Sequence, residues 1–404
     1  MRPYRFPLLG ASIATVLMMI GYVTLGVTSS QADSHTFDTL TQSGFEHFYS
    51  LEYEQAIHDF QKALDANPDE PKSVNHLLEA TLFQELYRYN ALDTRLYAKE
   101  RFLTSKQVPM DEAAKKRIRE LAERAQELSD RRLKANPKDV QALYSRGVTE
   151  GLMGTYLAVV EHAWWSALRK ALAARHDHEE VLKLQPDFSD AKTIPGGHNY
   201  VVGSLSLPAK ALVGVIGVHG DKALGLRLLA EAGKAGGESS ADARVALALF
   251  LRREERYQEA LDVVHSLTHD HPRNFLFALE EGNLLRDAGK AAEATSSFRS
   301  LLNACNEGKY PNAHVEMAQF DLGEALRSQG KHQEAFQAYQ VAGNPNGNDA
   351  ELRQRALLAA GEVSDILSKR DEALTQYRAA IAVNASTEEA GTARKHLDKP
   401  YRGH

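Results

Sequence analysis

The stretch YEQAIHDFQKALDANP, residues 53–68, decides the fold because its small and aromatic residues form one helical stripe. Ala56, Phe60 and Ala63 are four and three residues apart, which puts them on the same face of a helix. Pro68 ends that helix. The stripe returns in YQEALDVVHSLTHDHP (257–272), AAEATSSFRSLL (291–302), HQEAFQAYQVA (332–342) and DEALTQYRAAI (371–381). The chain therefore repeats one helical unit.

A second small residue stands at a fixed distance before the alanine of each stripe. The alanines are Ala56, Ala260, Ala294, Ala335 and Ala373, and twelve residues before them stand Gly44, Ala248, Gly282, Gly323 and Gly361. Glycine inside a helix costs roughly 1 kcal/mol relative to alanine, so its return at one register predicts a close crossing of two helices. The last four alanines are 34, 41 and 38 residues apart, as in arrays of helix-turn-helix repeats.

On these residues the sequence resembles the tetratricopeptide-repeat superfamily over 37–70 and about 241–387. The resemblance implies an all-α fold, a right-handed superhelical solenoid of helix-turn-helix repeats. Two positions depart from the pattern. Val264 stands where other units carry Phe298, Tyr339 or Tyr377, and Ala385 stands where a proline is expected.

We expect five segments along the chain: a signal peptide or uncleaved anchor (1–32), an N-terminal repeat (33–70), a divergent helical region with insertions (71–240), a C-terminal repeat array (241–387), and a capping helix and tail (388–404). Three stretches of the divergent region are similar to exported bacterial repeat proteins: NPKDVQALYSRGVTEGL, DFSDAKTIPGGHNYVVGSLSLP and GVIGVHGDKALGLRLLAEA. More distantly they resemble the tetratricopeptide-repeat protein 39 and inclusion-body-clearance group. This resemblance implies a helical scaffold and supplies no catalytic residues.

The first 32 residues are typical of a targeting segment. Arg2 and Arg5 precede an apolar run over 8–27, and the small residues of SSQA end at Ala32, as at a signal peptidase site. The run is also long enough to span a bilayer if it is not cleaved. We therefore expect export to the periplasm or cell envelope, with membrane contact only through 8–27. A single cysteine, Cys305, agrees with an oxidising compartment.

The glycines of LVGVIGVHGDKALGL, residues 212–226, do not complete a phosphate-binding loop. Ala223 follows Gly220, Asp221 and Lys222, where a P-loop needs Gly, Lys and then Ser or Thr. We predict a hinge at which one helix ends and the next begins with Asp221.

Histidines and aromatic residues offer weak candidates for other ligands. His265, His269 and His271 are the weak metal candidates, together with the run HDHEE at 176–180, and both groups are also explained as solvated helix ends. Trp164, Trp165 and Tyr156 have the spacing either of a stacking site or of a helical core. Since no serine lies in a Gly-x-Ser-x-Gly elbow and Cys305 lies within a repeat, we expect no catalytic residue, no cofactor and no enzyme.

The sequence favours a protein-interaction scaffold of the cell envelope, because a repeat array presents a long concave face to a protein or peptide. With a net charge of −6 the chain has no general attraction for nucleic acid. Two alternatives stay open: a periplasmic protein that binds a small molecule, lipid or metal through the divergent region, and a hydrolase hidden in the same region.

A row of arginines marks the predicted binding face. Arg252, Arg286 and Arg327 share one repeat position, and Arg253, Val245, Leu279 and Phe320 accompany them. The resemblance to the superfamily implies that this part of each first helix faces the groove. Guanidinium groups bind carboxylates with two hydrogen bonds, so the row suits an acidic segment or a C-terminal carboxylate. The alternative is that each arginine pairs with a nearby glutamate, such as Glu255 or Glu293, and serves only its own repeat.

Overall fold

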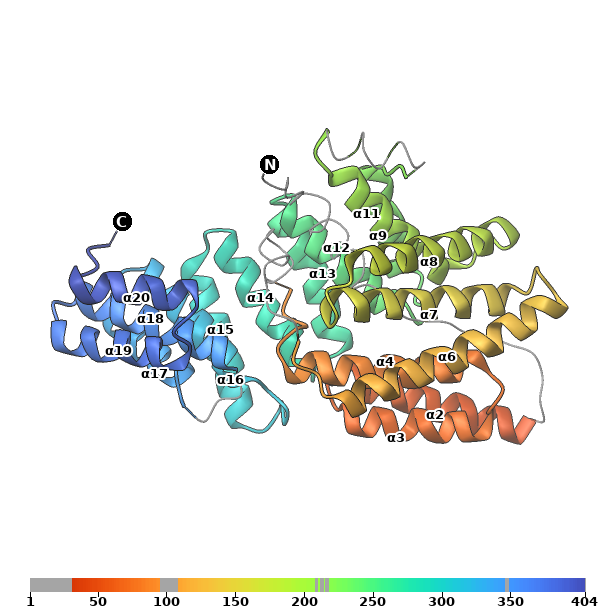
Figure 1. The fold of residues 1–404 in the computed structure, drawn as a ribbon, viewed down its shortest axis with the longest axis horizontal. Coiled ribbons are helices and arrows are strands. Elements are labelled where there is room, and N and C mark those ends of the chain that lie inside the picture. Colours follow the sequence, from red (N-terminus) through yellow and green to blue (C-terminus); the bar gives the residue numbers. More distant parts are fainter. Residues whose placement is uncertain are drawn as a thin grey trace, which may run out of the picture. The chain divides into compact units, whose positions relative to one another are not determined.

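The computed structural model describes residues 31–94, 108–207, 210, 214, 218–345 and 349–403, with side chains from Thr39 onward. Every regular element in these residues is a helix (Figure 1), which confirms the predicted all-α fold. The chain divides into unit 1, which ends at His271, and unit 2, which begins at Pro272. No helix among these residues is both long and apolar enough to cross a membrane. The predicted signal segment lies outside the described residues, apart from its last two residues at the start of α2.

Unit 1 is a series of helical hairpins. Its helices are α2 (Gln31–Tyr49), α3 (Tyr53–Ala66), α4 (Pro71–Arg88), α6 (Glu112–Ala135), α7 (Val140–Val159), α8 (Trp164–Leu184), the short η2 (Ser189–Lys192), α9 (Thr193–Ser204), α11 (Lys222–Lys234), α12 (Ser240–Arg253) and α13 (Tyr257–Asp270). Helices that follow one another pack together: α2 on α3, α4 on α6, α7 on α8, α9 on α11 and α12 on α13.

Unit 2 continues the hairpin pattern with shorter helices. They are α14 (Phe275–Asp287), α15 (Ala291–Asn306), α16 (Val315–Ser328), α17 (His332–Ala342), α18 (Ala350–Ile366), α19 (Arg370–Val383) and α20 (Glu388–Asp398). Each helix packs on its neighbours along the chain, and α20 packs on both α18 and α19. The predicted capping helix is therefore present as α20.

The recurring glycines are the points at which the two helices of a hairpin touch. A Cβ atom on Gly323 would lie 2.5 Å from Tyr339 Cε1, and one on Gly282 would lie 2.4 Å from Phe298 Cε1. Gly44 meets Phe60, and Gly361 meets Tyr377, at the same closeness. Since real Cβ atoms do not approach that near, these positions admit only glycine opposite a ring. The close crossing predicted from the sequence is confirmed.

Two further hairpins of unit 1 cross at a small residue with other side chains opposite it. In α7 and α8 the ring opposite Gly147 is His178, whose Cδ2 would lie 2.4 Å from a Cβ atom there. In α12 and α13 the smaller Val264 occupies the aromatic position, and the position of the glycine holds Ala248. Both Ala248 and Val264 are buried. Where alanine replaces glycine on the first helix, a side chain smaller than an aromatic ring stands opposite it on the second helix.

The predicted hinge at residues 212–226 contains the start of α11. Asp221 caps this helix, because its side chain accepts a hydrogen bond from the Leu224 amide at 2.9 Å. A Cβ atom on Gly225 would lie 2.4 Å from the Tyr200 nitrogen, and one on Gly220 would lie 2.7 Å from the Gly203 nitrogen. These glycines let the backbones of α9 and α11 approach each other. Residues 211–213 and 215–217 lie outside the described residues.

The division between the units comes later than the start of the expected C-terminal array at residue 241. The hairpin of α12 and α13 belongs to unit 1, because α12 packs on α11. Repeat spacing alone places this hairpin with the later units, and packing places it with the divergent region.

Candidate functional site

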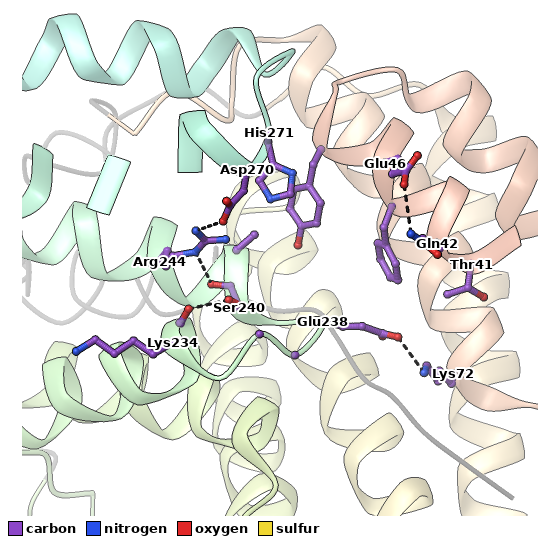
Figure 2. Close-up of a pocket in the computed structure, with 16 residues that line it drawn as sticks. Thr41, Gln42, Glu46, Lys72, Lys234, Glu238, Ser240, Arg244, Asp270 and His271 are labelled. Carbon is purple, nitrogen blue, oxygen red and sulfur yellow. Dashed lines mark hydrogen bonds and ion pairs between the residues drawn. The ribbon is translucent and has the colours of Figure 1, made fainter. Parts of the chain in front are cut away.

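A cleft of about 750 Å³ in unit 1 is the candidate site (Figure 2). Helix α2, the start of α4, the connection between α11 and α12, and the end of α13 form its walls. The lining residues used below are Gln42, Phe45, Glu46, Tyr49, Lys72, Lys234, Glu238, Ala241, Arg244 and His271. A cleft of this size suits a small molecule or a few residues of a peptide.

The connection between α11 and α12 is held by a buried carboxylate. Asp190 accepts hydrogen bonds from the Ser239 amide at 3.0 Å and from its hydroxyl at 2.8 Å. A Cβ atom on Gly237 would lie 2.3 Å from Asp190 Oδ1, so only glycine fits between them. Gly236 has a φ of +73°, which favours glycine. The sequence GGESS therefore builds a rigid wall, although these residues show no helical period.

Glu238 extends from this wall to helix α4. Its carboxylate lies 3.1 Å from Lys72 Nζ and 3.3 Å from His76 Nε2 (Figure 2 shows the first contact). Burial lowers the pKa of His76, and Glu238 opposes that shift. The ion pair joins α4 to the α11–α12 connection and closes one side of the cleft.

The opposite side of the cleft carries Arg244. Its Nη1 lies 2.6 Å from Asp270 and 3.2 Å from the Ser266 hydroxyl, and its Nε donates to the Ser240 carbonyl oxygen. Beside it, the His271 ring lies 4.5 Å from the Tyr49 ring. Burial and the nearby Arg244 lower the pKa of His271 to about 4, so this ring is neutral at pH 7. The cleft therefore combines the Arg244 guanidinium group, which makes contacts through Nε and Nη1, with neutral rings.

The arginines of the predicted row make contacts within their own units. Arg252 is buried and donates to the Thr94 hydroxyl at 3.5 Å within unit 1. In unit 2, Arg286 Nη1 lies 2.9 Å from Asp321 and Arg327 Nη1 lies 2.8 Å from Glu362. Each of these two pairs joins the first helix of one repeat to the first helix of the next, so neither proposed pairing within a repeat is the one found for Arg286 or Arg327.

The residues expected beside that row differ in burial. Leu279 and Phe320 are buried in the core, and the Arg355 guanidinium lies 4.6 Å from the centre of the Phe320 ring. Val245 and Arg253 are half-buried in α12. Fifth positions of the first helices therefore serve packing between helices, because each first helix is covered on both sides by neighbouring hairpins.

Residues 279–349 match the tetratricopeptide repeat family, and they span α14 to α17 with the glycine and ring contacts described above. Residues 279–349 therefore carry tetratricopeptide repeats. Comparison with curated proteins gave no match. The resemblance of the middle region to the tetratricopeptide-repeat protein 39 group stays a prediction.

Comparison with solved structures found similar chains, three of which follow. Pseudomonas aeruginosa pilF is 16% identical, with 65% of this chain and 100% of that chain covered and a TM-score of 0.41. YrrB, a TPR protein with an unusual peptide-binding site, is 14% identical, with 66% and 97% covered and a TM-score of 0.32. Yeast Tom70 is 12% identical, with 91% and 89% covered and a TM-score of 0.37. Tetratricopeptide repeats typically serve as non-catalytic scaffolds for protein–protein interaction.

The structure separates the histidines considered as metal ligands. His265 and His269 are exposed, whereas His271 packs on Tyr49. No group of three His, Cys, Asp or Glu side chains in the described part of the chain is arranged to hold a metal ion. His178 corrects the interpretation of HDHEE as a solvated helix end, because it is buried against Gly147 and burial lowers its pKa to about 3.

The aromatic residues Tyr156 and Trp165 also differ in burial. Tyr156 is a core residue whose hydroxyl donates to Glu161 at 2.7 Å, whereas the Trp165 side chain is 71% exposed. The core interpretation therefore holds for Tyr156 and is wrong for Trp165. Cys305 is half-buried in α15, and burial raises the pKa of its thiol.

Proposed function

We propose that the protein is a non-enzymatic interaction scaffold of the cell envelope that holds a segment of a partner protein in the cleft of unit 1. The tetratricopeptide repeats support a role in protein interaction. The targeting pattern of residues 1–32 supports export to the periplasm or envelope. The single observation that carries the proposal is the 750 Å³ cleft with walls fixed by Asp190 and Glu238.

The chemistry of the cleft favours a segment that combines an apolar side chain with a carboxylate. Phe45, Tyr49 and Ala241 supply apolar surface, and most of the lining is apolar. Arg244 uses Nε and Nη1 for contacts within unit 1, which leaves Nη2 for a ligand carboxylate among the contacts of the described residues. An acidic side chain or a C-terminal carboxylate would pair with that nitrogen.

A site-specific photo-crosslinker tests the proposal. Placed at the exposed Gln42 on the rim, it should join the protein to a segment of one partner in an envelope extract, and mass spectrometry identifies that segment. The same crosslinker at Lys116 is the matched control, because Lys116 is exposed on α6 and does not line the cleft. Arg244→Gln should weaken capture at Gln42 at least tenfold, as expected for loss of a charge-assisted hydrogen bond of about 1.5–3 kcal/mol. Equal crosslinking at both positions would refute the proposal.

The volume of the cleft also supports the second candidate, a small-molecule or lipid ligand, because drug-sized pockets fall between about 300 and 1,000 Å³. A thermal-shift panel of small molecules and lipids separates the two. A ligand that raises the melting temperature of the wild-type chain, but not that of a chain with Ala241→Trp in the cleft, would favour the small molecule.

A further inference from the structure

The segment that follows α20 leaves the helix and returns to the first helices of unit 2. Lys399 is extended, with φ −130° and ψ 119°, and Pro400 cannot continue a helix because it has no N–H. The Tyr401 amide then donates to Asp365 Oδ2 at 2.8 Å. Arg327 Nη2 donates to the Tyr401 hydroxyl at 3.1 Å, and the guanidinium group lies 5.3 Å from the centre of the ring. We refer to residues 399–403 as the return segment.

The groups that hold the return segment are already organised by unit 2 itself. Asp365 is 1% exposed and accepts from Arg370 Nη1 at 2.9 Å and from the Tyr377 hydroxyl at 2.9 Å. Arg327 pairs with Glu362 at 2.8 Å. None of these contacts involves Tyr401, so we expect the site to keep its arrangement when the segment leaves.

Arg370 sets the point at which the segment begins. Its Nη2 donates to the carbonyl oxygens of His396 and Leu397, both at 2.7 Å, which caps the end of α20. Because the same guanidinium group also bonds Asp365, the end of α20 and the seat of the Tyr401 amide are fixed by one residue. The turn at Lys399 and Pro400 then brings Tyr401 to Asp365 and Arg327.

We propose that the return segment is an intramolecular ligand, and that its seat on Arg327 and Asp365 is a receptor for an extended protein segment with a tyrosine. In such a segment the amide of the tyrosine donates to Asp365, and its hydroxyl and ring take the place of Tyr401 on Arg327. The partner binds only when the return segment leaves, which makes the segment autoinhibitory. This surface is separate from the unit 1 cleft, so failure of either proposal leaves the other untouched.

A fluorescent peptide with the sequence of residues 398–403, DKPYRG, is the probe. It should bind the full chain carrying Tyr401→Ala about tenfold more tightly than the wild-type chain. The factor follows from an effective concentration of order 1 mM for a short tether, set against a dissociation constant of order 100 μM for so small a peptide. The matched control chain carries Arg402→Ala, since the Arg402 side chain is exposed and makes no contact with Arg327 or Asp365 among the described residues, and it should bind the probe as weakly as wild type.

Changes in the peptide test the recognition without disturbing the protein. Tyrosine to alanine in the probe should abolish binding to the Tyr401→Ala chain, and tyrosine to phenylalanine should weaken it several-fold because the hydroxyl bond to Arg327 is lost. Equal binding of the probe to the wild-type and Tyr401→Ala chains would overturn the proposal.

The stability of the variant separates a ligand from a structural part. We expect the melting temperature of the Tyr401→Ala chain, followed by circular dichroism, to stay within a few degrees of wild type. A large loss would overturn the proposal, because Tyr401 would then belong to the core of unit 2. Concentration-dependent dimerisation of the wild-type chain that Tyr401→Ala abolishes would also overturn it, because the segment would then belong to a second copy.

Discussion

Hairpins in unit 1 and unit 2 cross at a small residue, but the side chain opposite that residue varies more in unit 1. In unit 2, Gly282, Gly323 and Gly361 each face a phenyl or phenol ring. In unit 1 the side chains at this position are the phenyl ring of Phe60, the imidazole of His178 and the smaller Val264. The difference shows that the hairpin requires complementary sizes across the crossing and does not require a particular aromatic residue.

The two units also differ in how they treat buried charge. Burial lowers the pKa of four interior histidines in unit 1, His76, His178, His198 and His271, and of one in the described part of unit 2, His314. In unit 2, among the residues that the structure describes, arginine–carboxylate pairs run from one repeat to the next. Unit 1 is therefore expected to respond to pH, and unit 2 to the loss of an ion-pair partner.

The largest expected effect is that of Arg286→Gln in unit 2. It removes the cation that faces Asp321, a carboxylate with no exposed surface. Breaking a buried pair on one side costs about 3 kcal/mol. Circular dichroism in urea should show earlier unfolding, whereas tryptophan fluorescence should not change, because Trp164 and Trp165 both lie in unit 1. Arg299→Gln, in an exposed pair with Glu334, is the control, with an expected loss below about 1 kcal/mol. Equal losses of stability in the two variants would show that the buried pair contributes no more than the exposed one.

A smaller effect is expected from Gly323→Ala, which places a Cβ atom 2.5 Å from the Tyr339 ring. Overpacking of this kind costs about 1–3 kcal/mol. Combining it with Tyr339→Val reproduces the pair of Ala248 and Val264 from unit 1. The double variant should therefore lose about 1 kcal/mol less stability than the sum of the losses of the two single variants. Urea titration of the four chains measures this coupling. Strict additivity would mean that the two positions do not sense each other.

His178→Phe should make unit 1 resemble unit 2 and reduce its sensitivity to acid. In the folded chain the pKa of His178 is about 3, and in the unfolded chain it is about 6.5. Between these values only the unfolded state binds the proton, so stability falls as the pH falls below about 6.5. The variant should lose about 1.4 kcal/mol less per pH unit between pH 6 and pH 4. Tryptophan fluorescence in urea measures this in unit 1.

Two buried carboxyl groups of unit 1 act in the opposite sense, since burial raises the pKa of Asp190 and Asp242 and the folded state gains protons there. Comparing wild type with His178→Phe cancels their contribution, because both chains keep them. A slope that is the same in the two chains would mean that His178 is protonated without unfolding.

The smallest effect is expected at Gly391 in α20, where an added Cβ atom meets nothing within 4 Å. Gly391→Ala should stabilise unit 2 by about 0.5–1 kcal/mol, because alanine favours the helix. Set against Gly323→Ala, it separates helix propensity from close packing. A loss of stability at Gly391 would show that the helix crossing is not the reason for the other glycines.

Much of the fold follows from the sequence because the register of Gly44, Gly282, Gly323 and Gly361 is local. Each glycine and its ring lie sixteen residues apart in one hairpin, so side-chain size at a fixed spacing is enough to predict the crossing. The candidate site was not predictable in this way. The GGESS connection has no periodic pattern, and its partner Asp190 lies 49 residues before Ser239.

The sequence by itself determined the helical hairpins, the start of α11 at Asp221 and the capping helix α20, because caps, proline and helical spacing act within a few residues. Only the tertiary structure decided which carboxylate faces Arg286, how α2 and the α11–α12 connection enclose the cleft, and where Tyr401 comes to rest. These contacts join residues 35 to more than 190 positions apart, such as Arg286 with Asp321 and Tyr49 with Asp242. Their geometry depends on how each hairpin packs on the next, and the pattern of any single repeat does not contain that information.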